Sequence, residues 1–377
     1  MNIAIVCYPT FGGSGVLATE LGKALSEKGH SIHFITYQQP VRLSGFHANI
    51  FYHEVRVPTY PLFDYPPYET ALASTMVDVI LNNHIDLLHV HYAIPHASAA
   101  FMAKQILARH NKAIPVITTL HGTDITLVGR DKTFSPVVKF SMEESDVLTA
   151  VSENLKQETY RNFNLDKPIE VIHNFVDVKR FHRKSAPGAK SLLAPNGEKI
   201  IVHASNFRKV KRVDDVVKTF IKINEKIPSI LLLIGDGPER PYIESLCRDH
   251  EGCARIKFLG KQEQMEEILP LSDLFLLPSE YESFGLAALE AMAAEVPVIS
   301  SNAGGLPEII IQGNCGYMSN IGDTDDMAAN AIKILSDLEV HKQFKKNALA
   351  QAEKFDLHFI VPIYEKLYAK LVPLTLS

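Results

Sequence analysis

Two glutamates lie eight positions apart in the segment 280-EYESFGLAALE-290, directly after DLFLLP, an apolar run typical of a buried strand. On a regular helix, residues eight apart are separated by about 12 Å along the axis and rotated by about 80°. Glu282 and Glu290 therefore cannot act on one atom as a pair of catalytic carboxylates. They could instead contact two ends of one long ligand, and a nucleoside diphosphate sugar has about the required length.

The alanine-rich run between these glutamates predicts a helix that begins at residues 283–285. The first N–H groups of a helix have no partner inside it and lie at its positive end. The backbone N–H groups of Phe284, Gly285 and Leu286 are therefore candidates to bind an anion or sugar hydroxyls. Glu290 would lie further along the helix, near a ribose, unless both glutamates are ordinary surface residues.

A basic loop, 203-HASNFRKVKRVDD-215, follows the first apolar strand of the second half of the chain. A lysine at the carboxyl end of a parallel strand is well placed to act as a point charge on a diphosphate leaving group. We assign this role to Lys211. Lys209 and Arg212 are interpreted as solvent-exposed loop residues.

The first predicted strand is followed by the turn 10-TFGGSG-15. Gly12 and Gly13 would permit a tight turn and Ser14 could cap the following helix, so that backbone N–H groups bind phosphate or carboxylate. The turn lacks the full GxGxxG spacing, and no GK[ST] follows it, so it is not a Walker A loop. A purely structural turn with a capping serine is the alternative.

Three further motifs contain residue types that can bind a metal or a sugar. His121 in 118-TTLHGTD-124 ends a predicted strand, so it could contact a sugar hydroxyl or developing charge, or it could be a core histidine. His89 and His91 in HVHYAIPH would point the same way on a strand, but no carboxylate or cysteine completes a metal site. Asp323 and Asp325 form a D-x-D, which we interpret as the N-cap region of a helix.

Apolar strands alternate with amphipathic helices along the whole chain, which indicates parallel βαβ units. The pattern restarts after residues 167–177, and residues 191–199 are expected to be a polar turn. We therefore predict an α/β protein with two doubly wound domains, 1–168 and 169–355. A helical C-terminal segment, 356–377, is expected to return to the first domain. Ligands of such folds bind at the carboxyl ends of the strands, here in a cleft between the domains.

The composition is that of an ordinary globular protein. The 377 residues carry a net charge of −5, with 46% hydrophobic and 21% charged residues, so no basic surface for a nucleic acid is indicated. The apolar runs are too short to insert into a membrane, and the N-terminus is expected to be a strand rather than a signal peptide. Cys7, Cys247, Cys253 and Cys315 form no CxxC pair, which favours reduced thiols in the cytoplasm. A homo-oligomer is left open.

Together these motifs resemble a known enzyme family. The string SEYESFGLAALEAMAAEVPVISSNAGGLPE, which contains Glu282-x7-Glu290, is similar to the signature of the retaining GT-B glycosyltransferases of family 4. The GGSG turn, HGTD, the loop with Lys211 and the C-terminal helix occur in the family's order, so the resemblance covers essentially the whole chain. It implies a GT-B fold with two Rossmann-like domains. Longer strings, such as HVHYAIPHA and HASNFRKVKR, resemble a malate-using subgroup, which implies UDP-N-acetylglucosamine (UDP-GlcNAc) as donor and L-malate as acceptor.

The resemblance also implies roles for individual residues. The expected catalytic set is His121, Asn206, Lys211 and Glu282. The expected donor-binding residues are Gly13, Asn206, Lys211, Gln262 (through its backbone, beside the uracil), Glu282, Phe284, Gly285, Leu286 and Glu290. The expected acceptor-binding residues are Ser14, Tyr92, Thr119 and Asn154. No cofactor and no metal ion are expected, because Lys211, Asn206 and the Gly13 turn would stabilise the leaving phosphate.

One position departs from the family pattern. Family members usually carry an arginine where this chain has Asn206, so the diphosphate would be held by one charge fewer unless Arg208 contributes; Asn206 resembles the malate-using subgroup. Four alternatives remain: a family 4 transferase with another sugar or acceptor, a UDP-GlcNAc 2-epimerase of the same architecture, a lipid-linked transferase, and a non-catalytic nucleotide-sugar binding module. A lipid-linked transferase would need a basic amphipathic helix, and the candidate helices are only weakly basic.

Overall fold

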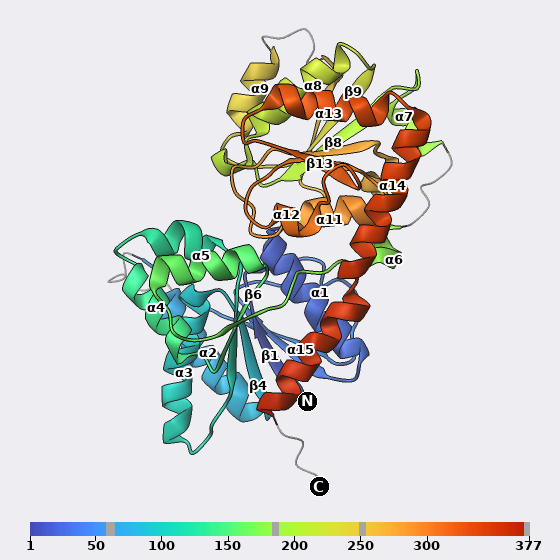
Figure 1. Ribbon diagram of the computed structural model, residues 1–377. Helices are drawn as coiled ribbons and strands as arrows, with labels where there is room; N and C mark the ends of the chain where they lie inside the picture. The colour runs from blue at the N-terminus through green and yellow to red at the C-terminus, as the bar shows by residue number, and fades with distance from the viewer. Residues whose placement is uncertain (58–64, 183–187, 249–253, 373–377) are drawn as a thin grey trace. The chain divides into compact units, whose positions relative to one another are not determined.

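The computed structural model of the chain describes residues 1–57, 65–182, 188–248 and 254–372 and divides into two compact units (Figure 1). Unit 1 comprises Met1–Asn174 and His358–Ser377, and unit 2 comprises Phe175–Leu357. The expected boundary at 168/169 placed residues 169–174 in the second domain. These residues instead contain the last strand of the first sheet, in which Ile169 pairs with Leu148.

Unit 1 is built on a seven-stranded sheet whose strand pairs are all parallel. Its strands are β1 (Asn2–Val6), β2 (Ser31–Thr36), β3 (Ile50–Glu54), β4 (Leu87–His91), β5 (Val116–Leu120), β6 (Val147–Ala150) and β7 (Ile169–Val171). The strand order is β3-β2-β1-β4-β5-β6-β7, so the order reverses between β1 and β4. The carboxyl ends of β1, β4, β5 and β6 therefore lie next to one another at this point.

Helices cover both faces of the sheet of unit 1. They are α1 (Gly13–Glu27), α2 (Tyr68–Asn82), α3 (Ser98–Arg109), α4 (Ser135–Glu144), α5 (Glu153–Phe163) and α15 (Leu357–Leu371), with the short turns η1 (Ala93–Ala97), η2 (Thr123–Leu127) and η3 (Val128–Arg130). On β4, Leu88 and Val90 pack against α2 and α3. Because side chains alternate along a strand, His89 and His91 point to the opposite face.

The helix α15 supplies part of that opposite face and confirms the prediction of a C-terminal helix (Figure 1). Tyr364 and Tyr368 of α15 are fully buried, and the hydroxyl of Tyr368 lies 2.7 Å from Nδ1 of His89. On its outer side, Glu365 forms an ion pair with Lys28 at 2.8 Å. Residues from the end of the chain thus complete the core of unit 1.

Unit 2 contains a six-stranded sheet, also with only parallel pairs among its named strands. Its strands are β8 (Lys199–Ser205), β9 (Ser229–Gly235), β10 (Ile256–Gly260), β11 (Leu274–Leu277), β12 (Val298–Ser301) and β13 (Gly316–Ser319). The order β10-β9-β8-β11-β12-β13 reverses between β8 and β11. The two loops that follow these strands are therefore neighbours.

The helices of unit 2 also surround its sheet. They are α6 (Val178–Phe181), α7 (Ala189–Leu193), α8 (Val213–Asn224), α9 (Arg240–Arg248), α10 (Met265–Ile268), α11 (Leu286–Ala293), α12 (Leu306–Ile309), α13 (Thr324–Leu335) and α14 (Leu338–Ala352), with the turns η4 (Lys209–Lys211), η6 (Leu269–Leu271) and η7 (Glu353–Phe355). One face is packed by α8 and α13, whose apolar residues join the central strands in one core. The expected polar turn at 191–199 is partly helical, because α7 extends to Leu193.

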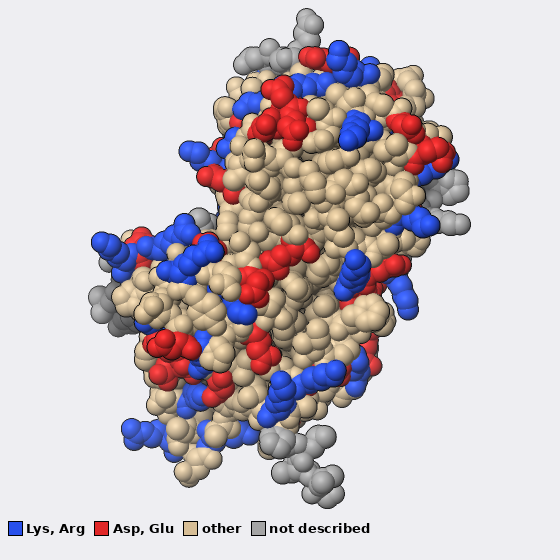
Figure 2. Space-filling model, viewed as in Figure 1, with Lys and Arg blue, Asp and Glu red and all other residues tan. Residues whose placement is uncertain are grey.

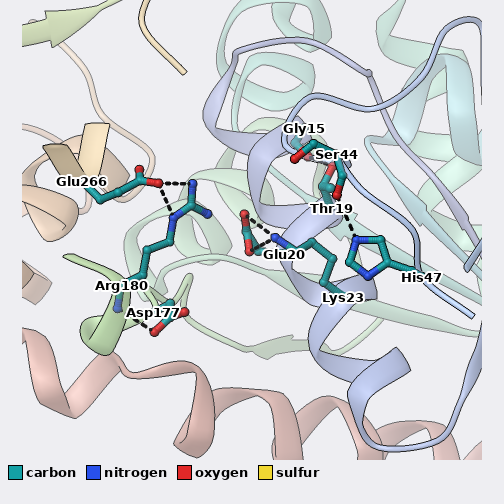
Figure 3. Close-up of polar contacts among 9 residues, drawn as sticks. All are labelled: Gly15, Thr19, Glu20, Lys23, Ser44, His47, Asp177, Arg180 and Glu266. Atoms are coloured by element: carbon teal, nitrogen blue, oxygen red, sulfur yellow. Dashed lines mark hydrogen bonds and ion pairs between the residues drawn. The ribbon is translucent and has the colours of Figure 1, made fainter. Parts of the chain in front are cut away.

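An ion pair anchors the segment with which the chain enters unit 2 (Figure 3). The side chain of Asp177 caps α6 by accepting from the N–H of Arg180 at 3.1 Å. The guanidinium of Arg180 donates through two nitrogens to one oxygen of Glu266, at 2.9 and 2.8 Å. Both side chains are mostly buried, so this contact joins α6 firmly to α10.

The surface carries charge of both signs. On the face shown in Figure 2, basic and acidic side chains are interspersed over each unit. Among the residues that the structure describes, no helix is both long enough and apolar enough to cross a bilayer. Cys7, Cys247 and Cys315 are free thiols, and Cys253 lies outside the described residues.

Candidate functional site

The candidate site of unit 2 lies where the loops after β8 and β11 meet. The loop after β8 forms the turn η4, which ends at Lys211, and the loop after β11 contains Glu282. The N–H of Glu280 donates to the carbonyl of Val210 at 2.8 Å, so the backbones of the two loops are directly joined. Parallel α/β sheets bind ligands at such a reversal of strand order.

Lys211 and Glu282 form a close ion pair at this point. The Nζ of Lys211 lies 2.6 Å from Oε1 of Glu282, and the hydroxyl of Ser279 donates to the same oxygen at 2.8 Å. The two charged side chains are 20% and 11% exposed, respectively. A ligand that separates this pair must give each group a new partner: a phosphate for the cation, and hydroxyls that donate hydrogen bonds to the carboxylate.

The backbone of Glu282 is held by a glycine pair that follows β12. The N–H of Gly305 donates to the carbonyl of Glu282 at 2.8 Å. Gly304 has a φ of +59°, and a Cβ added to it would lie 1.9 Å from that same carbonyl oxygen. Only a glycine can approach Glu282 this closely, so Gly304 and Gly305 determine where the carboxylate is presented.

We expect Gly304→Ala to lower the free energy of unfolding of unit 2 by about 1–3 kcal/mol, because it adds a backbone clash to the strain of a positive φ. Gly313→Ala is the matched control. Gly313 also has a positive φ, +71°, but the nearest atom to its added Cβ is a ring carbon of Tyr317 at 3.7 Å. Urea denaturation compares the two, and equal losses would show that the contact with Glu282 is unimportant.

The helix α11 begins later than expected. Its first residue is Leu286 and its N-cap is Gly285, with a φ of +96°, whereas residues 283–285 were expected to be its first turn. The N–H groups of Phe284, Gly285 and Leu286 precede or open the helix, so their expected role in binding the donor stays a prediction. Glu290 lies one turn into α11 and is only 8% exposed, which argues against an ordinary surface position.

Three other predicted positions of unit 2 are now located. Asn206 is exposed directly after β8, and its carbonyl would lie 2.1 Å from a Cβ on Gly237, so it contacts the loop after β9. Gln262 lies in the loop after β10, where its side chain donates to the carbonyl of Leu259 at 2.6 Å. Asp323 caps α13 by accepting from the N–H of Asp326 at 3.0 Å, which confirms the N-cap interpretation of the D-x-D motif.

The candidate site of unit 1 is formed by residues at the ends of four adjacent strands. Ser14 follows β1, Tyr92 follows β4, His121 follows β5 and Asn154 follows β6 at the start of α5. The N–H of Ala93 donates to the carboxylate of Asp124 at 2.9 Å, which joins the loops after β4 and β5. Burial raises the pKa of Asp124 to about 6, although backbone N–H groups oppose this.

Ser14 does not cap α1, contrary to expectation. The helix begins at Gly13 with Gly12 as its N-cap, and the hydroxyl of Ser14 instead lies 2.7 Å from that of Tyr92. The glycine that matters for packing is Gly15, because a Cβ there would lie 2.3 Å from the carbonyl oxygen of Tyr8. This close approach brings the positive end of α1 to the end of β1. The roles of Gly13 and Ser14 in binding substrate stay predictions.

His121 belongs to a group of buried histidines. Its Nε2 lies 2.8 Å from Nδ1 of His91, and the ring of His91 stacks on that of His89 at a centroid distance of 4.5 Å. Burial lowers the pKa of His89 and of His121 to about 3 and that of His91 well below its usual value. Among the described residues, no group of three or more histidine, cysteine or carboxylate side chains is placed to hold a metal ion.

Thr119 has a different position from the other predicted acceptor residues. It is fully buried, and its hydroxyl lies 2.7 Å both from Nε2 of His89 and from the hydroxyl of Thr149. Side chains alternate along β5, and that of Thr119 lies on the sheet face that α15 covers. On that face Thr119 contacts His89. This placement argues against direct contact with an acceptor.

Sequence reasoning missed several residues that shape these sites. Ser279 binds Glu282, and Gly304 and Gly305 hold its backbone, although all three lie in strings that were examined for other residues. A serine three positions before a loop glutamate gives a weak local signal. The contact between His91 and His121 joins residues 30 positions apart, so no local pattern could reveal it.

Two family models match the chain, one in each half. Residues 11–180 match "Glycosyltransferase Family 4" and residues 188–351 match "Glycosyl transferases group 1". The chain is 47% identical, over 98% of its length and 96% of the relative's, to N-acetyl-alpha-D-glucosaminyl L-malate synthase of Bacillus anthracis. It is 26% identical, over 92% of both chains, to an uncharacterized glycosyltransferase of Methanocaldococcus jannaschii.

Solved structures share the fold of the whole chain. A sucrose-phosphate synthase from Thermosynechococcus elongatus superposes with a TM-score of 0.80 at 23% identity, covering 98% of this chain and 99% of that one. Anabaena HepE in complex with UDP-glucose gives a TM-score of 0.77 at 19% identity, covering 98% and 100%. The two Rossmann-like units thus have the GT-B architecture expected from the sequence.

Proposed function

We propose a specific reaction from the premise that this chain belongs to the family 4 glycosyltransferases and is a glycosyltransferase enzyme. The reaction transfers N-acetylglucosamine from UDP-GlcNAc to the hydroxyl group of L-malate, giving the N-acetylglucosaminyl malate and UDP. The resemblance noted in the sequence implies that this product is the first intermediate of bacillithiol biosynthesis. The 47% identity to the N-acetyl-alpha-D-glucosaminyl L-malate synthase of Bacillus anthracis supports the transferred sugar and the acceptor.

The observation that carries the proposal is the convergence of Lys211, Ser279 and Glu282 at the strand reversal of unit 2. When the donor binds, Lys211 turns to the diphosphate and Glu282 accepts hydrogen bonds from sugar hydroxyls. Positive charge already in place stabilises the negative charge that develops on the leaving phosphate. Asn206 and the N–H groups at the start of α11 add donors, and Glu290 accepts from the ribose.

Unit 1 is proposed to hold the acceptor. L-malate carries two carboxylates and one hydroxyl, so its site must combine hydrogen-bond donors with positive electrostatic potential. Ser14 and Tyr92 supply hydroxyl groups at the N-terminal end of α1, where the helix dipole favours an anion. Asn154 follows β6, near the N-terminus of α5, and offers a side-chain amide. His121 contacts the transferred sugar.

The bond changes balance without a further reactant. The bond between the anomeric carbon and the β-phosphate oxygen breaks, and a bond from the malate hydroxyl oxygen to the same face of that carbon forms. The hydroxyl proton passes to an oxygen of the departing phosphate, so configuration at the anomeric carbon is retained. The reaction is proposed to need no metal ion, because Lys211 and the surrounding donors take over its electrostatic role.

The proposal predicts malate-dependent release of UDP that survives chelation. The purified protein is incubated with UDP-GlcNAc and EDTA, with L-malate or with succinate, which keeps both carboxylates but has no hydroxyl. UDP in quenched samples is quantified by ion-exchange chromatography, which EDTA does not disturb, and the anomeric configuration of the product is determined by proton NMR. We expect release only with L-malate and an α-linked product.

Other outcomes identify other activities. Conversion of UDP-GlcNAc without any acceptor would indicate the epimerase. Release that depends on a different hydroxyl compound would exclude malate but keep the family. Loss of release on adding EDTA, restored by a divalent cation, would contradict the metal-independent mechanism.

A further inference from the structure

Four histidines are buried at or near the ends of β4 and β5, and their rings differ in how many nitrogens have a hydrogen-bond partner. His89 uses both ring nitrogens, with partners Tyr368 and Thr119 at 2.7 Å each. Nδ1 of His96 contacts the carbonyl oxygen of His91. His91 contacts His121 through Nδ1, but its Nε2 is buried with no partner in the described part of the chain. His91 is therefore connected to the candidate site by one nitrogen only.

Each of these rings carries a single N–H. Burial lowers the pKa of all four histidines, and the neighbouring histidines lower that of His91 further, so all are neutral near pH 7. A neutral imidazole has one donor and one acceptor nitrogen. In the contact between His91 and His121, one ring must therefore donate and the other must accept.

The buried Nε2 of His91 decides which ring donates. If His121 donated, His91 would carry its hydrogen on Nε2, and this N–H would be buried without an acceptor. If His91 donates from Nδ1, its Nε2 holds only a lone pair. Buried N–H groups without partners are rarer in folded proteins than buried acceptors without partners. The second arrangement is therefore favoured.

This arrangement determines the state of His121. Its Nε2 accepts from His91, so its own hydrogen must be on Nδ1. No hydrogen bond joins Nδ1 to a described residue, yet Nδ1 is not one of the buried ring nitrogens without a partner, as Nε2 of His91 is. Part of the 8% of His121 that remains exposed therefore lies at Nδ1. We propose that His91 is a positioning residue that donates to Nε2 of His121 and so presents Nδ1–H of His121 as a donor to a substrate oxygen.

The identity of the substrate oxygen rests on the proposed function, whereas the position of the hydrogen on the His121 ring does not. A hydroxyl oxygen of the transferred sugar, or a carboxylate oxygen of the acceptor, can accept from Nδ1–H. A ring held with the opposite tautomer would present a lone pair there, and it would repel a carboxylate. Fixing the tautomer in the free enzyme removes this wrong alternative before substrate binds.

The first test is spectroscopic. The protein is labelled with 15N-histidine, and the His121 signals are assigned by their loss in His121→Gln. We expect Nδ1 of His121 to have the chemical shift and couplings of a protonated nitrogen and Nε2 those of an unprotonated one. A protonated Nε2 on His121 in the unmutated protein would overturn the proposal, whatever the enzyme's substrates are.

Two variants test the role of His91. Asparagine places its amide nitrogen about where Nδ1 lies, so His91→Asn keeps the donor and should keep the Nδ1–H signal of His121. His91→Leu removes it and should give a mixture of tautomers. In the malate assay we expect kcat/KM to fall about 10- to 100-fold in His91→Leu and to recover to within about threefold of the unmutated value in His91→Asn.

A buried histidine elsewhere provides the control. His341 of α14 contacts the carbonyl of Asp273 at 2.9 Å in unit 2, so His341→Leu removes a buried imidazole without touching this group. It should leave the His121 spectrum unchanged.

If His91→Leu keeps a pure Nδ1–H signal, His91 does not set the tautomer. If the unmutated protein shows no malate-dependent turnover, the proposed function fails while the NMR result still stands.

Discussion

Replacing Lys211 by methionine is expected to lower kcat/KM for UDP release by about 10²- to 10³-fold, with most of the loss in kcat. In the proposed mechanism the Nζ of Lys211 compensates the charge on the phosphate as it leaves, and removing one such preorganised donor has an effect of this size in other enzymes. Lys209→Met is the matched control, because Lys209 opens the same turn but is exposed. It should change kcat/KM by less than about threefold.

Loss of Lys211 also leaves Glu282 unpaired, so stability must be measured alongside activity. The carboxylate is only 11% exposed, and an uncompensated charge there should lower the free energy of unfolding by about 1–3 kcal/mol. The double variant Lys211→Met/Glu282→Gln should recover much of this stability but none of the activity. Recovery of activity in the double variant would show that Lys211 only neutralises Glu282.

Acid should destabilise unit 1 at pH values above those at which ordinary surface carboxylates titrate. The pKa of His89 and of His121 is lowered to about 3 and that of His96 to about 4, below the usual 6.5 of an unfolded chain. Well above pH 6.5 neither state binds protons at these rings. Between about pH 6.5 and 4 the unfolded chain binds protons that the folded unit excludes, so stability falls with falling pH.

The size of this effect follows from proton linkage. Each buried histidine contributes up to about 1.4 kcal/mol per pH unit, so the group amounts to several kcal/mol by pH 5. The raised pKa of Asp124, about 6, acts in the opposite direction, because the folded unit binds that proton first. A single carboxyl offsets only one histidine, so the net effect remains destabilising.

The measurement must read unit 1 separately, since a chain of two units need not unfold in one step. Hydrogen exchange of peptides from β4 and α15 in urea, between pH 7.5 and 5, provides this. We expect His89→Gln to reduce the slope of the unfolding free energy of unit 1 against pH by the equivalent of about one proton. His110→Gln, at an exposed position after α3, should leave it unchanged. An unchanged slope in His89→Gln would contradict the explanation.

Much of the fold follows from local patterns. Buried parallel strands are continuous apolar runs, so DLFLLP and ILLLIG were recognisable, and their alternation with helices predicted two doubly wound sheets. The strand β3, IFYHE, was not recognised, because it lies at the edge of its sheet and Phe51 and Tyr52 remain exposed. The short β7 was assigned to the wrong domain for a similar reason, since only pairing with β6 identifies its sheet.

The site shows the same division between local and distant information. The positions of Lys211 and Glu282 after strands followed from the order of elements, because strand ends that carry polar residues meet at a reversal of strand order. The direct contact between these two residues, which are 71 positions apart, could not be predicted from local patterns. Neither could the burial of Thr119. Ser14 was expected to cap a helix because serine often does so, but α1 already begins at Gly13, so Ser14 lies within the helix and its hydroxyl contacts Tyr92.

The two-part composition of unit 1 has a consequence for synthesis of the protein. Unit 2 is one uninterrupted segment, so it can fold as soon as residue 357 has left the ribosome. Unit 1 cannot, because Tyr364 and Tyr368 fill its core and Tyr368 is the partner of His89. The first half of the chain must therefore wait, with its sheet incompletely covered, until the last helix is made. We therefore expect the segment translated first to be the last to reach its native state.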